Sequence, residues 1–310
     1  MKKLLFIPLL LLLIFTTACG DNKTRTPPEP PLIATKGITA LPETAAVVPT
    51  EIPESQEPDS QVPSALPPEP QPVSFSTQDG QSLQGKFYPA SLEGAPVIVL
   101  MHWYPGDQDE WTEIAFWLQN RGLTGDQNGV PWKDPSWFPS LDPDVSYNIL
   151  TFTFRNCEGK CNAPEPDGWL LDARASLEYA RTLEGADPDR VLAIGASIGA
   201  DGAIDGCAAV LGTDPNACLG ALSLSPGNYL GPSYSDMVTA LGANDPPRPA
   251  WCLFDKNDAD SVVCTQESGN NYYQESWSDG NLHGMHLITP NLDPRPLERI
   301  PEFLDYVLGN

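Results

Sequence analysis

The chain has 310 residues, with 17 Lys and Arg against 41 Asp and Glu and a formal net charge of −24. This acidity makes nucleic acid a poor partner and argues against docking of the protein surface on anionic lipid headgroups. The length is sufficient for one substantial domain beside segments that build no core.

The N-terminal residues have the pattern of a secretion signal. Lys2 and Lys3 precede an apolar run over residues 4–15, shorter than the roughly twenty residues that a membrane-spanning helix needs. Residues 16–19, TTAC, resemble the lipobox of bacterial lipoproteins, with Thr16 where lipoboxes usually have Leu. The resemblance implies a signal peptide over 1–18, a lipid on Cys19, and an exported protein anchored to a bacterial membrane and facing its extracytoplasmic side. A plain secreted protein with a stray cysteine is the alternative.

Residues 19–74 read as a linker that starts at the lipidated cysteine. Prolines recur every few residues, acidic side chains are scattered among them, and no aromatic residue occurs from 20 to 74. Such a composition cannot form a core, so we expect a disordered Pro-rich tether that leads to a folded domain over 75–310. Pro-rich ligands for a partner domain are the alternative.

The folded part is predicted to alternate strand and helix. Apolar runs predict strands at 96–102, 148–154, 191–195, 219–225 and 249–255, a weaker strand at 271–278, and two short strands around Asp79-Gly80 within 75–89. Helical spacing predicts helices over 110–122, 168–185, 234–241 and 296–308. The alternation predicts an α/β fold with a mostly parallel central sheet and helices on both faces.

The stretch VLAIGASIGADGA, residues 191–203, predicts a buried strand that turns abruptly into a helix. Ser197 stands at the turn, and Gly195 and Gly199 supply the lack of bulk that is needed where strand and helix pass close together. A G-x-S-x-G pattern also arises by chance, so the surrounding sequence must decide whether Ser197 is a nucleophile.

Six cysteines besides Cys19 fall into near neighbours: Cys157 with Cys161, Cys207 with Cys218, and Cys252 with Cys264. Proximity favours these local disulfides, and an oxidising compartment would stabilise them. Zinc is the rival interpretation of the closest pair, but no histidine cluster accompanies it. We therefore expect no metal and no cofactor.

In this context the folded part resembles an α/β-hydrolase over essentially its whole length. The resemblance rests on HWYPG after the third strand, RNCEG after the fourth, DPDRVLAIGASIGA at the fifth, an acidic loop after the seventh and His-Gly after the eighth. Within that superfamily the chain is most similar to compact serine esterases and dienelactone-hydrolase-like lipoproteins. It has Ser where true dienelactone hydrolases have Cys, which favours ordinary ester or amide acyl transfer.

The resemblance implies a catalytic triad in the chain order Ser197, Asp258, His283. A serine hydroxyl is a weak nucleophile, so an imidazole must take its proton and a carboxylate must fix the imidazole tautomer. Gly follows His283 directly, as in similar sequences, and His286 is the alternative base. Alignment with the strand-then-G-x-x-D pattern of the family selects Asp258, with Asp260 as the next choice. His102 ends the third strand and is expected to be structural.

The same resemblance implies an oxyanion hole made of the backbone N–H groups of Ile198 and Tyr104. Trp103, Tyr104 and Trp137 are predicted to line the substrate site. Trp137 belongs to an insertion over 123–147, for which a surface flap pinned by its own aromatic residues is an equal alternative. The stretch between the sixth and seventh strands, where many relatives carry a cap domain, is short.

We therefore expect a monomeric serine hydrolase, carboxylesterase-like, that acts on a small to medium ester through an acyl-enzyme. Its only other partner would be the membrane that holds the lipid anchor. A peptidase or amidase of the same fold is one alternative. A non-catalytic, surface-displayed binding lipoprotein is the other, and it predicts an incomplete triad.

Overall fold

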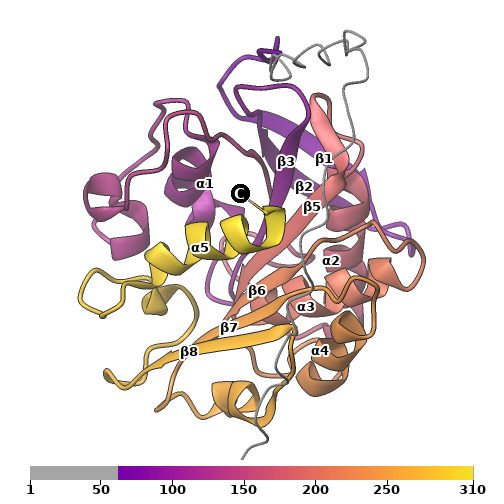
Figure 1. Ribbon diagram of the computed structural model, residues 1–310, viewed down its shortest axis with the longest axis vertical. Coiled ribbons are helices and arrows are strands. Elements are labelled where there is room, and N and C mark those ends of the chain that lie inside the picture. Colours follow the sequence, from indigo (N-terminus) through magenta and orange to yellow (C-terminus); the bar gives the residue numbers. More distant parts are fainter. Residues whose placement is uncertain (1–61, 310) are drawn as a thin grey trace, which may run out of the picture. The chain divides into compact units, whose positions relative to one another are not determined.

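The computed structural model describes residues 62–309, and its centre is an eight-stranded sheet in the order β1-β2-β4-β3-β5-β6-β7-β8 (Figure 1). The strands are β1 Gln71–Ser76, β2 Ser82–Tyr88, β3 Ala95–Met101, β4 Asn148–Phe152, β5 Ala186–Ala196, β6 Ala221–Leu224, β7 Ala250–Asp255 and β8 Tyr272–Trp277. Only β2 runs antiparallel to its neighbours, β1 and β4, and the remaining pairs are parallel. The predicted mostly parallel sheet is confirmed.

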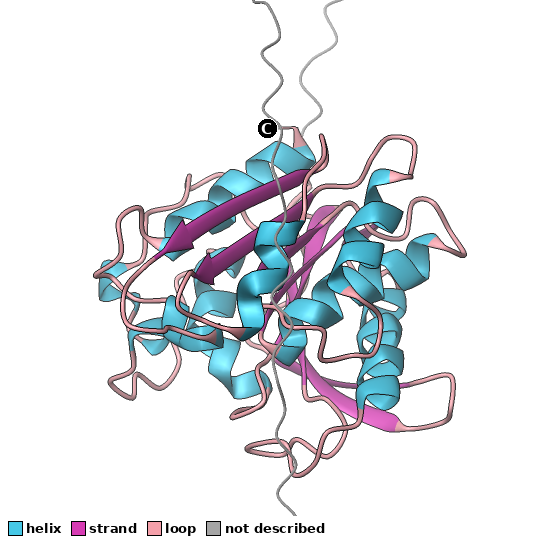
Figure 2. Ribbon diagram, turned by 90° about the horizontal axis from the view of Figure 1, so that it is seen from below, coloured by secondary structure: helices cyan, strands magenta, loops and turns pink. Residues whose placement is uncertain are grey.

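Helices cover both faces of the sheet (Figure 2). On one face lie α1 (Thr112–Gln119) and α5 (Pro296–Leu308), and on the other α2 (Pro166–Ala180), α3 (Ile198–Leu211) and α4 (Tyr234–Gly242). Each predicted helix is therefore present. The ends of α5 match the prediction, and those of the other three differ from it by up to five residues.

Side chains of strand β3 contribute to the hydrophobic cores on both faces of the sheet. All its residues are buried, and successive side chains of a strand point to opposite faces. Val97 and Val99 join the core beneath α2 and α3, whereas Ile98 and Leu100 join the core beneath α1 and α5. A continuous apolar run is what a strand covered on both faces requires.

The folded domain starts earlier than the predicted boundary at residue 75. Strand β1 begins at Gln71, and before it Ser64 N–H donates to Ser91 O at 2.8 Å and Glu93 N–H donates to Val62 O at 2.8 Å. The boundary was misplaced because β1 is an edge strand with only its Phe75 buried, and an edge strand tolerates a proline such as Pro72. Proline content alone therefore does not distinguish this edge strand from a disordered tether.

The three predicted local disulfides are present: Cys157–Cys161, Cys207–Cys218 and Cys252–Cys264. Because structural disulfides persist in oxidising compartments, they indicate an extracytoplasmic location. Among residues 62–309, no helix has the length and apolar character needed to cross a membrane. The predicted signal peptide, Cys19 and most of the predicted tether lie outside the described residues.

Candidate active site

Ser197 lies where β5 turns into α3, in a backbone conformation that side chains rarely adopt. Its φ is 53° and its ψ is −118°, and a positive φ at a non-glycine residue marks strain that the surroundings must hold in place. A Cβ on Gly195 would lie 1.8 Å from the Gly199 carbonyl oxygen, and one on Gly199 would lie 2.2 Å from the Met101 carbonyl oxygen. The close passage of strand and helix thus depends on both glycines.

Three side chains from separate loops meet at this turn in a hydrogen-bonded chain. His283, in the loop after β8, places Nε2 2.8 Å from Ser197 Oγ and Nδ1 2.7 Å from Asp258 Oδ2. Asp258 comes from the loop after β7 and is only 6% exposed. Because β5, β7 and β8 belong to the parallel part of the sheet, their carboxyl ends share one edge, which brings these distant residues together. An imidazole so placed can accept the serine proton while the carboxylate orients it.

The acid loop holds Asp258 from two further sides. Ser261 Oγ donates to Asp258 Oδ2 at 2.7 Å, and the Asp260 N–H donates to Asp258 Oδ1 at 3.2 Å. The alternative acid Asp260 is engaged elsewhere, because its Oδ2 accepts a hydrogen bond from the Tyr229 hydroxyl at 3.0 Å. Of the two carboxylates considered, the structure brings Asp258 to His283.

His286 lies outside this hydrogen-bonded chain. Its ring packs edge-on against Trp103, with ring centroids 4.8 Å apart, and against Trp132 at 5.4 Å. Partial burial, with a smaller contribution from His283, lowers the pKa of His286, and a neutral imidazole suits an aromatic surrounding. The geometry therefore makes His283, rather than His286, the partner of Ser197.

His102 has the structural environment that was expected. The Phe154 N–H donates to its Nε2 at 3.0 Å, and its Nδ1 lies 2.8 Å from the Trp103 carbonyl oxygen. Burial lowers the pKa of His102 to about 4, so the ring is neutral near pH 7 and carries its proton on Nδ1. The histidine thereby joins the end of β3 to the loop that follows β4.

The predicted oxyanion donors border the same serine. Ile198 is the first residue of α3, where an N–H has no partner within the helix. Within residues 62–309, neither the Ile198 N–H nor the Tyr104 N–H donates to a protein acceptor. A Cβ built on Gly284 would lie 3.5 Å from Ser197 Cβ and 2.9 Å from Trp103 Cε3. The loop that carries Trp103 and Tyr104 therefore lies beside the serine.

The loop of the Cys157–Cys161 disulfide binds the loop that carries Tyr104. The Cys161 N–H donates to the Tyr104 carbonyl oxygen at 3.0 Å, and the Gly159 N–H donates to Asp107 Oδ2 at 2.9 Å. The disulfide loop is thus in direct contact with Tyr104.

The predicted substrate-binding aromatic residues have three different environments. Tyr104 is half-buried and packs edge-on against Trp169 at 6.0 Å. Trp103 is 7% exposed and packs edge-on against His286 and Trp132. The Trp137 indole N–H donates to Pro131 O at 2.8 Å, and its carbonyl accepts from Arg295 at 3.0 Å. Its role in substrate binding stays a prediction.

The insertion is tied down by hydrogen bonds of aromatic and charged side chains. Trp117 Nε1 donates to Pro139 O at 2.7 Å, and Lys133 and Trp132 both donate to Glu110, each at 2.9 Å. These bonds pin the insertion to α1 and to the residues before it. Trp132, rather than Trp137, extends from the insertion toward His286 and Trp103.

Two residues at the site were missed by the sequence analysis. Ser261 binds the carboxylate of Asp258, and the ring of Tyr229 packs edge-on against His283 at 6.2 Å. Ser261 lies three residues after Asp258, in the 3₁₀ helix Asp260–Gln266 that follows it. Tyr229 comes from the loop after β6, and no local pattern marks it.

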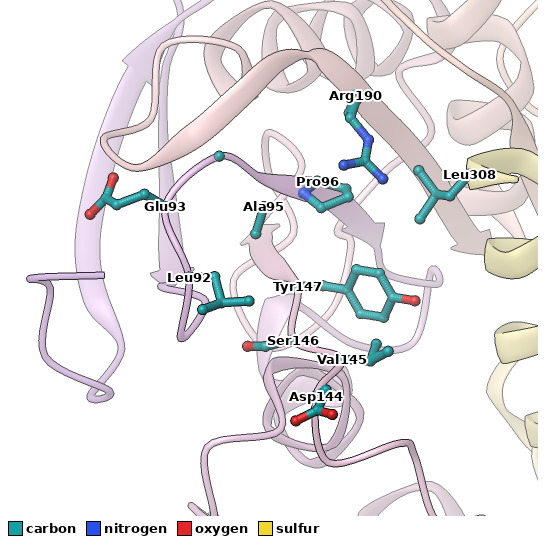
Figure 3. Close-up of a pocket in the computed structure, with 11 residues that line it drawn as sticks. Leu92, Glu93, Ala95, Pro96, Asp144, Val145, Ser146, Tyr147, Arg190 and Leu308 are labelled. Atoms are coloured by element: carbon teal, nitrogen blue, oxygen red, sulfur yellow. The ribbon is translucent and has the colours of Figure 1, made fainter. Parts of the chain in front are cut away.

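A hollow of about 180 Å³ lies at the opposite edge of the sheet (Figure 3). Pro96 of β3, Tyr147 before β4 and Arg190 of β5 line it. These residues belong to the amino-terminal parts of the parallel strands, whereas Ser197 follows the carboxyl end of β5. The hollow is therefore separate from the candidate active site.

Comparisons with known proteins bear on the fold. No family model matches the chain. The uncharacterized protein YfhR of Salmonella typhi is 25% identical over 142 residues, which are 46% of this chain and 42% of YfhR. An uncharacterized protein of Mycobacterium tuberculosis is 28% identical over 129 residues, 41% of this chain and 37% of its own. The chain thus spans less than half the length of these curated relatives.

Solved structures resemble the chain over most of its length. The Pyrococcus furiosus esterase Pf2001 gives a TM-score of 0.53 at 16% identity and covers 80% of this chain and 98% of its own. The α/β-hydrolase GrgF of Penicillium gives 0.50 at 15% identity, with 78% and 100% covered, and a puromycin hydrolase gives 0.52 at 18%, with 78% and 40% covered. At these identities the likeness shows the fold alone, and the chain has the α/β-hydrolase fold.

Proposed function

We propose that the protein is a serine hydrolase of the carboxylesterase type. The observation that carries the proposal is the pair of hydrogen-bond distances, 2.8 Å and 2.7 Å, that join Ser197 Oγ to His283 and His283 to Asp258. The three side chains are far apart in sequence and meet at Ser197. The backbone of Ser197 is strained, and such strain is common at functional sites.

In the proposed reaction, Ser197 Oγ attacks the ester carbonyl carbon while His283 Nε2 takes the hydroxyl proton. The Ile198 and Tyr104 N–H groups donate to the oxyanion of the tetrahedral intermediate. The ester C–O bond then breaks, and the alcohol leaves with the proton from His283. Water attacks the acyl-enzyme in turn and gives its proton to His283, after which the acid departs and Ser197 Oγ is reprotonated.

The surroundings of the triad favour a small to medium ester as substrate. Between β6 and β7 the chain forms only the short helix α4, so substrate approaches from solvent rather than beneath a cap. The 29% exposure of the His283 side chain agrees with an open site. The peptidase or amidase alternative shares the covalent chemistry but has no observation of its own in its favour.

A panel of p-nitrophenyl esters of increasing acyl length tests this proposal. We expect turnover to be highest for short acyl chains and to disappear in Ser197→Ala. Activity that rises steadily through long chains contradicts the substrate size. Turnover that survives unchanged in Ser197→Ala contradicts the serine-hydrolase assignment.

We also propose that a lipid on Cys19 displays the domain on the extracytoplasmic side of a bacterial membrane, after removal of residues 1–18. The lipobox-like TTAC sequence and the three disulfides support this placement. Metabolic labelling with an alkyne fatty acid should mark the wild-type protein and leave Cys19→Ser unmarked. Equal labelling of both proteins contradicts the lipid anchor.

A further inference from the structure

Asp201 lies one turn after Ser197 on α3 and is almost completely buried. Its Oδ1 accepts a hydrogen bond from the Gly227 N–H at 3.1 Å, and its Oδ2 accepts one from the Tyr229 N–H. No basic side chain among residues 62–309 forms an ion pair with it. Burial raises the pKa of Asp201 to about 7, and the two N–H donors oppose that rise.

The loop that Asp201 binds carries Tyr229 to the imidazole of His283. The two rings meet edge to face, with centroids 6.2 Å apart and planes at 89°. A Cβ on Gly227 would lie 2.4 Å from the Tyr229 ring, so the ring packs directly on the backbone of its own loop. Movement of this loop therefore moves the surface against which His283 rests.

The hydroxyl of Tyr229 reaches the acid loop as well. It donates to Asp260 Oδ2 at 3.0 Å, and the Asp260 N–H donates to Asp258 Oδ1 at 3.2 Å. Burial, together with the charge of Asp260, raises the pKa of the Tyr229 hydroxyl, which keeps its proton available for this bond. Tyr229 thus contacts the candidate base and the loop of its carboxylate partner.

We propose that Asp201 is a positioning residue that holds His283 in place through Tyr229, an inference that rests on the proposed function. An isolated buried carboxylate lowers stability unless other groups satisfy it, and here both oxygens are used to fix one loop. Asn in place of Asp201 keeps one acceptor oxygen and turns an NH2 group toward the other backbone N–H, so one of the two donors loses its acceptor and the loop relaxes. The Tyr229 ring then withdraws, and the imidazole samples positions in which Nε2 no longer reaches Ser197 Oγ.

The same helix supplies a matched control in Asp205. This residue lies one turn further along α3, is 1% exposed like Asp201, and has no hydrogen-bond partner for either carboxylate oxygen among the described residues. Burial, with a contribution from Asp201, raises its pKa well above the usual value. The two acids therefore share helix, burial and residue type, and only Asp201 binds the loop that carries Tyr229.

The test compares Asp201→Asn with Asp205→Asn in the full chain, using p-nitrophenyl acetate. Because a misplacement of about 1 Å typically costs about 100-fold in rate, we expect Asp201→Asn to lower kcat by about 10- to 100-fold with little change in KM. Asp205→Asn should keep kcat within about twofold of the wild type, because its carboxylate contacts no part of the site. Equal kcat values in wild type and Asp201→Asn overturn the proposal, and so does an equal fall in both variants.

Tyr229 provides a second pair of variants if Asp201→Asn fails to fold. Tyr229→Leu removes the ring from His283 and should lower kcat as Asp201→Asn does. Tyr229→Phe keeps the ring against His283, loses only the bond to Asp260, and should lower kcat less than Tyr229→Leu does. A Tyr229→Leu variant with wild-type kcat contradicts the proposed route to His283.

A readout independent of turnover separates this inference from the proposed function. NMR can follow exchange with water of the proton between His283 Nδ1 and Asp258. We expect that exchange to be faster by about tenfold or more in Asp201→Asn and unchanged in Asp205→Asn. If no Ser197-dependent turnover exists, the proposed function fails while the exchange rates still decide the positioning role. If turnover exists and exchange is unchanged in Asp201→Asn, only the positioning role fails.

Discussion

Gly195→Ala places a methyl group where β5 passes the first turn of α3. That Cβ would lie 1.8 Å from the Gly199 carbonyl oxygen and 2.2 Å from its carbonyl carbon. Real Cβ atoms essentially never come within 3.0 Å of such an atom, so strand and helix must separate by at least 1.2 Å, the difference between 3.0 Å and 1.8 Å. The only atoms available to move are backbone atoms beside Ser197.

A displacement of that size takes Ser197 Oγ, now 2.8 Å from His283 Nε2, beyond the hydrogen-bond reach of about 3.2 Å. We expect kcat for p-nitrophenyl acetate to fall by about 100-fold or more. Overpacking should also lower the free energy of unfolding by about 1–3 kcal/mol, measured by urea denaturation. A folded Gly195→Ala variant with wild-type kcat refutes the reasoning.

Gly212→Ala is the matched control for that substitution. Gly212 follows the last turn of α3, has a φ of −62°, and would place its Cβ no closer than 3.4 Å to its nearest neighbour. Alanine adopts this conformation without strain. The variant should keep both the wild-type kcat and the wild-type stability, and a loss equal to that of Gly195→Ala shows that the effect is not specific to the turn.

Three other perturbations test the buried charges and the disulfide beside the site. Because burial raises the pKa of Asp205, folding requires a proton that the unfolded chain releases above about pH 4. Wild-type stability should therefore fall as pH rises from 4 to 7 relative to Asp205→Asn, and parallel urea-denaturation profiles contradict this. Arg155→Ala leaves the fully buried Asp172 without its cationic partner. The free energy of unfolding should fall by about 3–5 kcal/mol, and a loss below about 1 kcal/mol contradicts this role of Arg155. The double variant Cys157→Ser, Cys161→Ser frees the loop that binds the Tyr104 carbonyl. Because the Tyr104 N–H is a proposed oxyanion donor, kcat should fall by about tenfold with little change in KM, and a wild-type kcat contradicts that role.

The sequence predicts best what local chemistry determines. The elbow at Ser197 follows from small residues within a few positions of the serine, and the sheet follows from apolar runs such as β3 that need cover on both faces. The candidate base and acid follow from the resemblance to α/β-hydrolases, which implies the chain order Ser197, Asp258, His283. Parallel strands that end at one edge then bring these residues together.

Contacts between distant loops could not be predicted in the same way. The bonds from Asp201 to Gly227 and Tyr229 join α3 to the loop after β6, and nothing in either segment identifies the other. The sequence assigns Trp137 to the site because it is aromatic and lies in an insertion, whereas its bond to Pro131 depends on the path of that insertion. An aromatic residue packs equally well against its own loop or against a substrate.

The most direct test of the account is to label the protein with a fluorophosphonate probe and to map the modified peptide by mass spectrometry. We predict a single phosphonyl adduct on Ser197, none in Ser197→Ala, and much slower labelling in His283→Ala. An adduct on a different residue, or equal labelling of the wild type and Ser197→Ala, contradicts the central claim that Ser197 is the nucleophile activated by His283.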